Sequence, residues 1–275
     1  MKNTIEITLV GLTNEVKEEL IAHLSLHHFD AFEEEAEFFK AYINEDVFDE
    51  NQLNKILAPF KVSYARKLIE EQNWNEVWES NFSPVLVDDF CAIRAEFHPQ
   101  FLEMEHVIHI TPKMSFGTGH HATTYMMIQQ MRNIDFKGKA VADFGTGTGV
   151  LAILAEKMES IHIVAIDYDD WSIENAKENF YRNNCVHIQL EKAEAFSTEQ
   201  KFNVILANIN KNVILDNSVN LSKSIFANGI LLLSGLLIED EKEILMSFLS
   251  KGFEHVNTIE KNNWICILMK LSLAN

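Results

Sequence analysis

The sequence is short of three things: cysteine, proline and positive charge. Its 3 cysteines, Cys91, Cys185 and Cys266, stand far apart, which argues against a disulfide framework or a zinc cluster. With only 4 prolines and no low-complexity tract, a long disordered linker is not expected. No apolar run reaches the roughly 18 residues that a membrane-spanning helix needs, and the first residues lack a signal-peptide core. We therefore expect a cytoplasmic protein with no membrane partner.

Positive charge is scarce. Lysine and arginine number 23 against 41 aspartates and glutamates, which gives a formal net charge of -18. A protein that binds nucleic acid needs a surplus of cations to neutralise phosphates, so we expect no direct nucleic-acid substrate. The excess of acid would suit a basic partner, and it would equally serve solubility alone.

Hydrophobic residues, in contrast, make up 47% of the chain, which is enough for packed cores. The length of 275 residues suits one large domain or two unequal ones. The first 70 residues read as strand-helix-strand-strand-helix-strand, the order of a ferredoxin-like α+β module. The expected strands are 4–10, 31–32, 37–43 and 61–66, and the expected helices are 14–24, with Asn14 as N-cap, and 49–57.

A short linker helix is predicted over 71–81. Asn73 and Glu76 have the spacing of a helix start, and Trp74 and Trp78 share one helix face. We interpret the two tryptophans as a packing pair, with cofactor stacking as the alternative.

From residue 82 the chain alternates apolar strands with helices, a pattern typical of a parallel sheet covered on both faces. The last two strands, 254–259 and 264–271, flank Asn262-Asn263 and should form an antiparallel hairpin. The expected fold class is thus α/β: a small N-terminal α+β domain is followed in the sequence by a Rossmann-like sheet over 82–275. The other expected strands are 85–87, 91–95, 107–110, 140–144, 161–166, 186–190, 204–207 and 230–233, and the helices are 150–158, 171–182, 211–226 and 239–250.

A glycine-rich turn between strand and helix is the strongest local signal. Gly145, Gly147 and Gly149 permit a sharp turn and leave room for a ligand, while the helix that follows favours an anionic group. Asp167 ends the next strand, 22 positions after Gly145, where a carboxylate can accept hydrogen bonds from both hydroxyls of a ribose. The G-x-G-x-G spacing departs from the dinucleotide fingerprint, so an S-adenosylmethionine site and a dinucleotide site both stay open at this point.

Two further segments point to the same region. Thr123 and Thr124 stand at the start of a predicted helix and offer side-chain donors. His120 and His121 are adjacent, so on a helix they would point apart and would not share a metal, and we expect no metal site. Asn208 follows an apolar strand, where its carbonyl oxygen can orient an attacking amine. Alternatively, Asn208 caps the next helix.

Together these motifs resemble the bacterial methyltransferase family of ribosomal large-subunit protein 11. The discriminating segment is Phe116–His121 with Thr123 and Thr124, since many methyltransferases share the glycine loop. The other matching residues are Asp143–Gly149, Ile166–Asp167, Ala207–Ile209, Ser234–Gly235 and, in the linker, Asn73–Trp74, Trp78 and Asn81–Phe82.

The resemblance implies a substrate-recognition domain at 1–70, a linker helix at 71–81 that repositions it, and a class I methyltransferase domain at 82–275. It implies S-adenosylmethionine as cofactor, bound through Thr124, Gly145, Asp167 and Asn208, with Gly147 beside them in the loop. Many family members carry Ile-Leu after the asparagine, whereas this chain has Ile209-Asn210, which predicts a more polar wall on the substrate side.

The expected activity is transfer of methyl groups from S-adenosylmethionine to lysine side-chain amines, N-terminal amines, or both, on ribosomal large-subunit protein 11, a basic substrate. Asn208 would orient the amine. The alternatives are a methyltransferase acting on RNA or on another protein, and a nicotinamide-dependent oxidoreductase.

Overall fold

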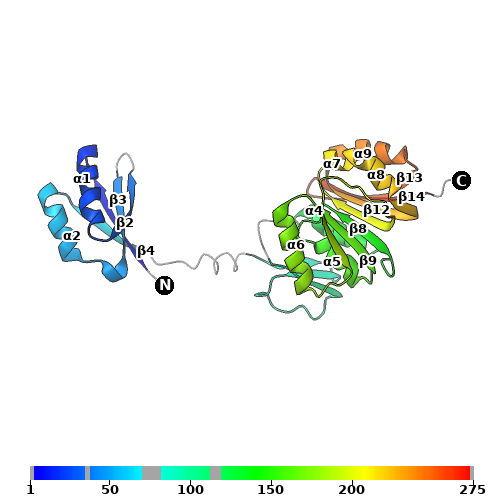
Figure 1. Cartoon of the computed structure of the whole chain (residues 1–275), viewed down its shortest axis with the longest axis horizontal. Helices are drawn as coiled ribbons and strands as arrows, with labels where there is room; N and C mark the ends of the chain where they lie inside the picture. Colours follow the sequence, from blue (N-terminus) through cyan, green and yellow to red (C-terminus); the bar gives the residue numbers. More distant parts are fainter. Residues whose placement is uncertain (1–2, 35–37, 70–81, 112–118, 273–275) are drawn as a thin grey trace. The chain divides into compact units, whose positions relative to one another are not determined.

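The computed structural model describes residues 3–34, 38–69, 82–111 and 119–272. It divides into two compact units, Met1–Asn81 and Phe82–Asn275, and each is described here by itself (Figure 1). The helix predicted over 71–81, with Trp74 and Trp78, lies outside the described residues.

The first unit is a four-stranded antiparallel sheet in the order β2-β3-β1-β4, with two helices packed on it. The apolar side chains of β1, Ile5, Ile7 and Leu9, are buried in one core with Leu20 and Leu24 of α1. The order of the elements along the chain confirms the predicted ferredoxin-like order. The elements are β1 (Thr4–Val10), α1 (Asn14–Ser25), β2 (Phe29–Glu34), β3 (Phe38–Asn44), α2 (Glu50–Leu57) and β4 (Tyr64–Ile69).

Several predicted boundaries in this unit are wrong, among them the strand predicted over 31–32, which spans Phe29–Glu34. Thr13, not Asn14, caps α1, since its side-chain oxygen accepts a hydrogen bond from the Val16 amide. The fourth strand begins at Tyr64 instead of residue 61, because a 3-10 turn over Ala58–Phe60 ends at Lys61 in the left-handed conformation, with φ 53°.

The second unit is built on a seven-stranded sheet in the order β10-β9-β8-β11-β12-β14-β13. Its first five strands run parallel, and β14 and β13 are antiparallel, as expected for the terminal hairpin. The strands are β8 (Ala140–Phe144), β9 (His162–Asp167), β10 (Ile188–Lys192), β11 (Phe202–Asn208), β12 (Ile225–Leu237), β13 (Phe253–Lys261) and β14 (Trp264–Leu271).

Helices cover both faces of this sheet, and each face has its own apolar core (Figure 1). One core includes side chains of α4 (Ala122–Met131), α5 (Val150–Lys157) and α6 (Asp170–Arg182), and the other includes side chains of α7 (Lys211–Asp216), α8 (Ser218–Lys223) and α9 (Glu241–Leu249). The single helix predicted over 211–226 is thus two helices. They separate at Asn217. Its side-chain oxygen accepts a hydrogen bond from the Phe196 amide, and its side-chain nitrogen donates one to the Val213 carbonyl.

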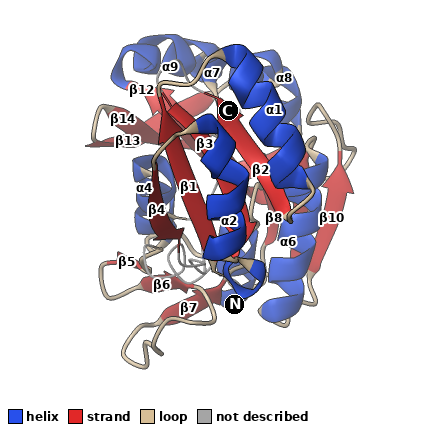
Figure 2. Ribbon diagram, turned by 90° about the vertical axis from the view of Figure 1, so that its left-hand side faces the viewer, coloured by secondary structure: helices blue, strands red, loops and turns tan. Residues whose placement is uncertain are grey.

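A second, three-stranded sheet packs on the α4–α6 side, formed by β5 (Val85–Val87), β6 (Cys91–Arg94) and β7 (His106–His109). Figure 2 shows these short strands side by side. Among the described residues, no helix is long and apolar enough to cross a membrane.

The parallel strands of the large sheet place their carboxyl ends along one edge, where ligands bind in open α/β sheets. The residues that follow β8, β9, β10, β11 and β12 therefore come together there.

Candidate functional site

The glycine loop after β8 adopts a left-handed backbone conformation that is unfavourable for residues other than glycine. Gly145, Gly147 and Gly149 have φ of 76°, 55° and 81°, a region that costs a non-glycine residue about 1–2 kcal/mol. A Cβ at Gly145 would lie 2.1 Å from the Ile209 methyl Cγ2, so the glycine loop lies too close to Ile209 to carry a side chain at this position. Gly149 is the N-cap of α5 and provides no side-chain cap. The Ala152 amide of the first turn interacts with the buried Asp143 carboxyl, and the amides before it can bind an anionic group.

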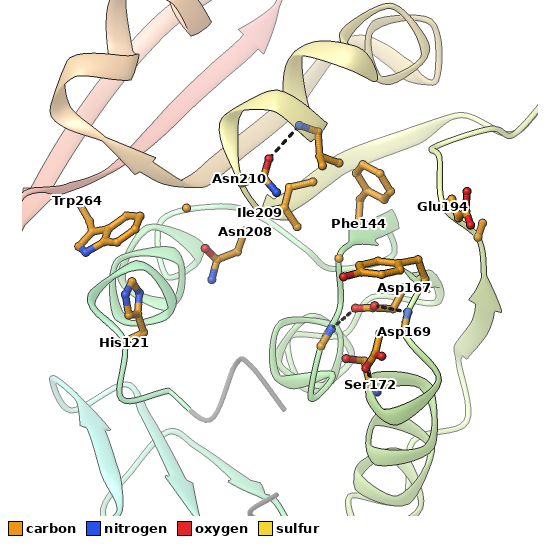
Figure 3. A pocket seen from close by; sticks show the side chains of 16 residues that line it. His121, Phe144, Asp167, Asp169, Ser172, Glu194, Asn208, Ile209, Asn210 and Trp264 are labelled. Carbon is orange, nitrogen blue, oxygen red and sulfur yellow. Dashed lines mark hydrogen bonds between the residues drawn. The ribbon is translucent and has the colours of Figure 1, made fainter. Parts of the chain in front are cut away.

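Asp167 ends β9 and connects this loop to the next one. Its Oδ2 accepts a hydrogen bond from the Gly147 amide at 2.8 Å, and its Oδ1 accepts one from the Asp169 amide at 3.1 Å (Figure 3). Each carboxylate oxygen can accept a further bond. The protein therefore fixes the orientation of the carboxylate and leaves it capacity for two hydroxyl donors.

A cavity of about 450 Å³ opens at this edge of the sheet (Figure 3), within the range of about 300–1,000 Å³ usual for small-molecule sites. A much smaller pocket of about 20 Å³ is lined by Thr124 and residues of the glycine loop, and it shares Gly145, Gly147 and Asn208 with the main cavity. The side chains labelled around the main cavity are those of His121, Phe144, Asp167, Asp169, Ser172, Glu194, Asn208, Ile209, Asn210 and Trp264.

The charge of the cavity has one sign. Asp167, Asp169 and Glu194 line it, and no lysine or arginine in the described part of the chain does. A ligand with cationic groups is therefore favoured, whereas the pyrophosphate of a dinucleotide would meet no positive side chain.

Asn208, the last residue of β11, lies where the two cavities meet. Its Nδ2 donates to the Thr124 hydroxyl at 3.3 Å, while its Oδ1 is buried and has no hydrogen-bond partner among the described residues. The alternative reading of Asn208 as a helix cap is wrong, because Asn210 caps α7 through a 3.1 Å bond from the Val213 amide. A buried carbonyl oxygen without a hydrogen bond is costly, and Asn208 lines both cavities, so a ligand bound there could supply the missing donor.

The start of α4 forms the wall opposite the glycine loop. His121 caps this helix by accepting a bond from the Thr123 amide, and its ring packs edge-on against Trp264 at 4.8 Å between centroids. Residues 112–118, which include Phe116, Gly117 and Thr118 of the discriminating motif, lie outside the described residues.

All five residues predicted for the site, Thr124, Gly145, Gly147, Asp167 and Asn208, line one of the two cavities. Their roles remain predictions. The sequence reasoning missed Tyr168, Glu194 and Trp264. The strand-end rule that selected Asp167 also applies to Tyr168 and to Glu194 after β10, whereas Trp264 had no such signal because it begins an antiparallel strand.

One buried carboxyl lies beneath the loop. Asp143 is fully buried, and burial raises its pKa to about 7 against the stabilising bond from the Thr146 hydroxyl at 2.6 Å. The charge of nearby Asp167 raises this pKa further. Its Oδ1 has no partner in the described part of the structure.

Comparison with known proteins agrees with this geometry. A family model described as Ribosomal protein L11 methyltransferase (PrmA) matches residues 9–272. A relative from Phocaeicola vulgatus, named Ribosomal protein L11 methyltransferase, is 38% identical over 247 residues, which cover 87% of this chain and 88% of the relative. A protein of the same name from Chlorobaculum tepidum is 35% identical over 281 residues, covering 98% and 96%.

Solved structures share the fold of this chain. The crystal structure of a ribosomal protein L11 methylase from Lactobacillus delbrueckii subsp. bulgaricus has a TM-score of 0.64 and 26% identity, and it covers 70% of this chain and 100% of its own. A methyltransferase from Pyrococcus furiosus, 17% identical with a TM-score of 0.51, shares the fold over 59% of this chain and 88% of its own.

Proposed function

The chain belongs to the ribosomal protein L11 methyltransferase family, and we propose that it methylates amino groups of ribosomal protein L11. It is an S-adenosylmethionine-dependent methyltransferase. The proposal concerns the substrate, the amines that react and the residues that serve the reaction.

The residues around the cavity fit this cofactor. The Asp167 carboxylate would accept bonds from the ribose hydroxyls, and the glycine loop with the α5 amides would hold the methionine carboxylate. Tyr168 and Glu194 line the same cavity and offer an aromatic face and an acceptor for the adenine amino group. When bound, the cofactor supplies a methyl group activated by a positively charged sulfur.

The Oδ1 of Asn208, which has no hydrogen-bond partner among the described residues, is the observation that supports amine methylation most directly. Because Thr124 holds the other side of this amide, the oxygen is fixed in place as an acceptor. An amine N–H that donates to it would be held with its lone pair free for attack. Positioning of this kind supplies most of the rate when the electrophile is already activated.

The amine must be neutral to react. A lysine side chain has an ordinary pKa of about 10.4 and an α-amine one of about 7.7–8.0, so near neutral pH both carry mostly the protonated form, the lysine far more so. We propose that both classes of amine are substrates. Turnover on a lysine should then rise with pH up to about 10, whereas turnover on an α-amine should level off near pH 8.

The decisive experiment is incubation of the protein with purified ribosomal protein L11 and labelled S-adenosylmethionine, followed by peptide mass spectrometry. We expect label on amino groups, and an Asn208→Ala variant should lower kcat about 100-fold. Unlabelled L11 beside a labelled RNA or a different labelled protein would contradict the proposal.

Two simple assays test the rival readings. Retention on heparin at moderate salt would favour a nucleic-acid substrate, which the net charge of -18 opposes. In thermal unfolding, S-adenosylmethionine should stabilise the protein and NAD should not. We propose that the enzyme acts in the cytoplasm, since its substrate is a ribosomal protein.

A further inference from the structure

Helix α6 carries a row of asparagines on one face. Asn175, Asn179 and Asn183, the last being its C-cap, are spaced four residues apart, and the first two are fully buried. Asparagine is a poor helix former, and a buried amide is costly unless its hydrogen bonds are made. A row of this kind therefore needs partners.

On one side, the partner is the open edge of β7, which is an edge strand of its sheet. The His109 amide donates to Asn183 Oδ1 at 3.0 Å, Asn183 Nδ2 donates to the His109 carbonyl at 2.6 Å, and the Thr111 amide donates to Asn179 Oδ1 at 2.8 Å. Four helical residues rise about 6.0 Å and two strand residues about 6.6 Å. Because these repeats match, the asparagines take the place of a neighbouring strand.

On the other side, the partner is the glycine loop. Asn179 Nδ2 donates to the Thr148 carbonyl at 2.8 Å and to Asn175 Oδ1 at 3.1 Å. Thr148 is fully buried and immediately precedes the N-cap of α5. The next residue of α6, Phe180, lies so close to Gly149 that a Cβ there would be 2.4 Å from its ring. Helix α6 thus packs against the glycine loop through Asn179 and Phe180.

We propose that Asn179 is a positioning residue for the cofactor, which it does not touch. Its single amide joins the Thr148 carbonyl of the loop to the Thr111 amide of the segment after β7. Without it, the buried Thr148 carbonyl would lose this hydrogen bond, and the loop would shift to replace it. The cofactor would then have to reorder the loop on binding. The inference rests on the cofactor site proposed above.

The neighbouring asparagine provides a matched control. Asn179→Leu removes all three of its side-chain hydrogen bonds, to Thr111, Thr148 and Asn175. Asn179→Asp keeps the acceptor for Thr111 and loses the donor to Thr148 and Asn175. Asn183→Leu removes only the contacts to β7 and to its own helix. Isothermal titration with S-adenosylmethionine and with S-adenosylhomocysteine measures affinity, and thermal unfolding without ligand measures stability.

Both Asn179 variants should bind each ligand about tenfold more weakly, and by the same factor, since the loop holds the part that the two ligands share. Asn183→Leu should lower the unfolding temperature and leave both affinities within about twofold of wild type. Equal weakening by Asn183→Leu would overturn the inference, because stability alone would then account for the effect.

An Asp167→Ala arm separates this inference from the proposed site. If Asp167→Ala binds weakly and the folded Asn179 variants bind normally, the role of Asn179 is refuted and the site stands. If Asp167→Ala binds normally, the proposed cofactor site itself is wrong.

Discussion

Asp167 combines two tasks in one carboxylate. It accepts the amides of Gly147 and Asp169, which join two loops, and it keeps acceptor capacity on the cavity side. Substitution of Asp167 should therefore weaken ligand binding and also disturb the two loops that it joins.

We expect Asp167→Ala to weaken S-adenosylmethionine binding between 10- and 100-fold, since charge-assisted hydrogen bonds contribute about 1.5–3 kcal/mol. Isothermal titration measures this. The control is Asp170→Ala, which removes the same charge from an exposed position paired with Lys192. Unchanged affinity in the Asp167 variant would show that the ribose site lies elsewhere.

Asp143 makes the stability of the protein depend on pH near neutrality. Its folded-state pKa of about 7 exceeds the ordinary value of 3.8. Between about pH 4 and about pH 7, therefore, the carboxyl keeps its proton in the folded protein and has lost it in the unfolded chain. Its contribution to stability is therefore complete below about pH 4 and is lost as the pH rises through about 7.

Asp143→Asn should remove this dependence. Between pH 5 and pH 8.5 the wild type should lose roughly 2–4 kcal/mol of unfolding free energy more than the variant. Thermal unfolding across the pH range measures the difference, and Asp216→Asn, at an exposed position of α7, is the control. Parallel pH profiles of wild type and Asp143→Asn would show that the carboxyl is ionised throughout.

At the scale of elements, the glycine loop depends on space as much as on conformation. Gly145 and Gly138 both have positive φ, 76° and 67°. A Cβ at Gly145 would overlap Ile209, whereas a Cβ at Gly138 would meet nothing within 4 Å. The two positions therefore separate steric overlap from backbone strain.

Gly138→Ala should cost only the strain, about 1–2 kcal/mol of stability, with cofactor affinity unchanged. Gly145→Ala should cost more and should reduce S-adenosylmethionine affinity at least tenfold, because Ile209 or the loop must move. Unfolding and titration of the two variants side by side test this. Equal affinities would mean that Ile209 gives way without disturbing the site.

Most elements followed from local pattern. The strand predicted over 140–144 has those bounds, because a run of apolar residues ends at a glycine turn. The helix predicted over 211–226 is divided, because the Asn217 side chain bonds to the Phe196 amide, a contact that no local pattern reveals.

At the scale of the whole molecule, the negative charge is unevenly distributed. Residues 1–81 hold 17 acidic and 7 basic residues, a net charge of -10 out of -18 in less than a third of the chain. We propose that this unit recognises the substrate, as the family resemblance implies. Complementary charge would then speed encounter with a basic protein more than it tightens the complex.

Replacing Glu33, Glu34, Glu35 and Glu37 by glutamine should slow methylation of L11 several-fold at low salt and little at high salt, where screening already weakens the attraction. Glu35 and Glu37 lie outside the described residues. The measurement is kcat/KM at two ionic strengths, and Glu254→Gln with Glu260→Gln, exposed on β13, is the control. Equal losses at both salts would leave the charge with a role in solubility only.

The sequence by itself determined the fold class and five residues that line the site. Strand ends, glycines and Asp167 are close together in sequence, and a parallel sheet brings consecutive strand ends to one edge. Only the tertiary structure decided which distant side chains meet: Asn208 with Thr124, His121 with Trp264, and Asn179 with the loop at Thr148. It also assigned the helix cap to Asn210 and left the Asn208 oxygen without a partner in the described part of the chain. The physical reason is that a strand-end pattern fixes where a residue emerges from the sheet, whereas its hydrogen-bond partner depends on how separate helices pack.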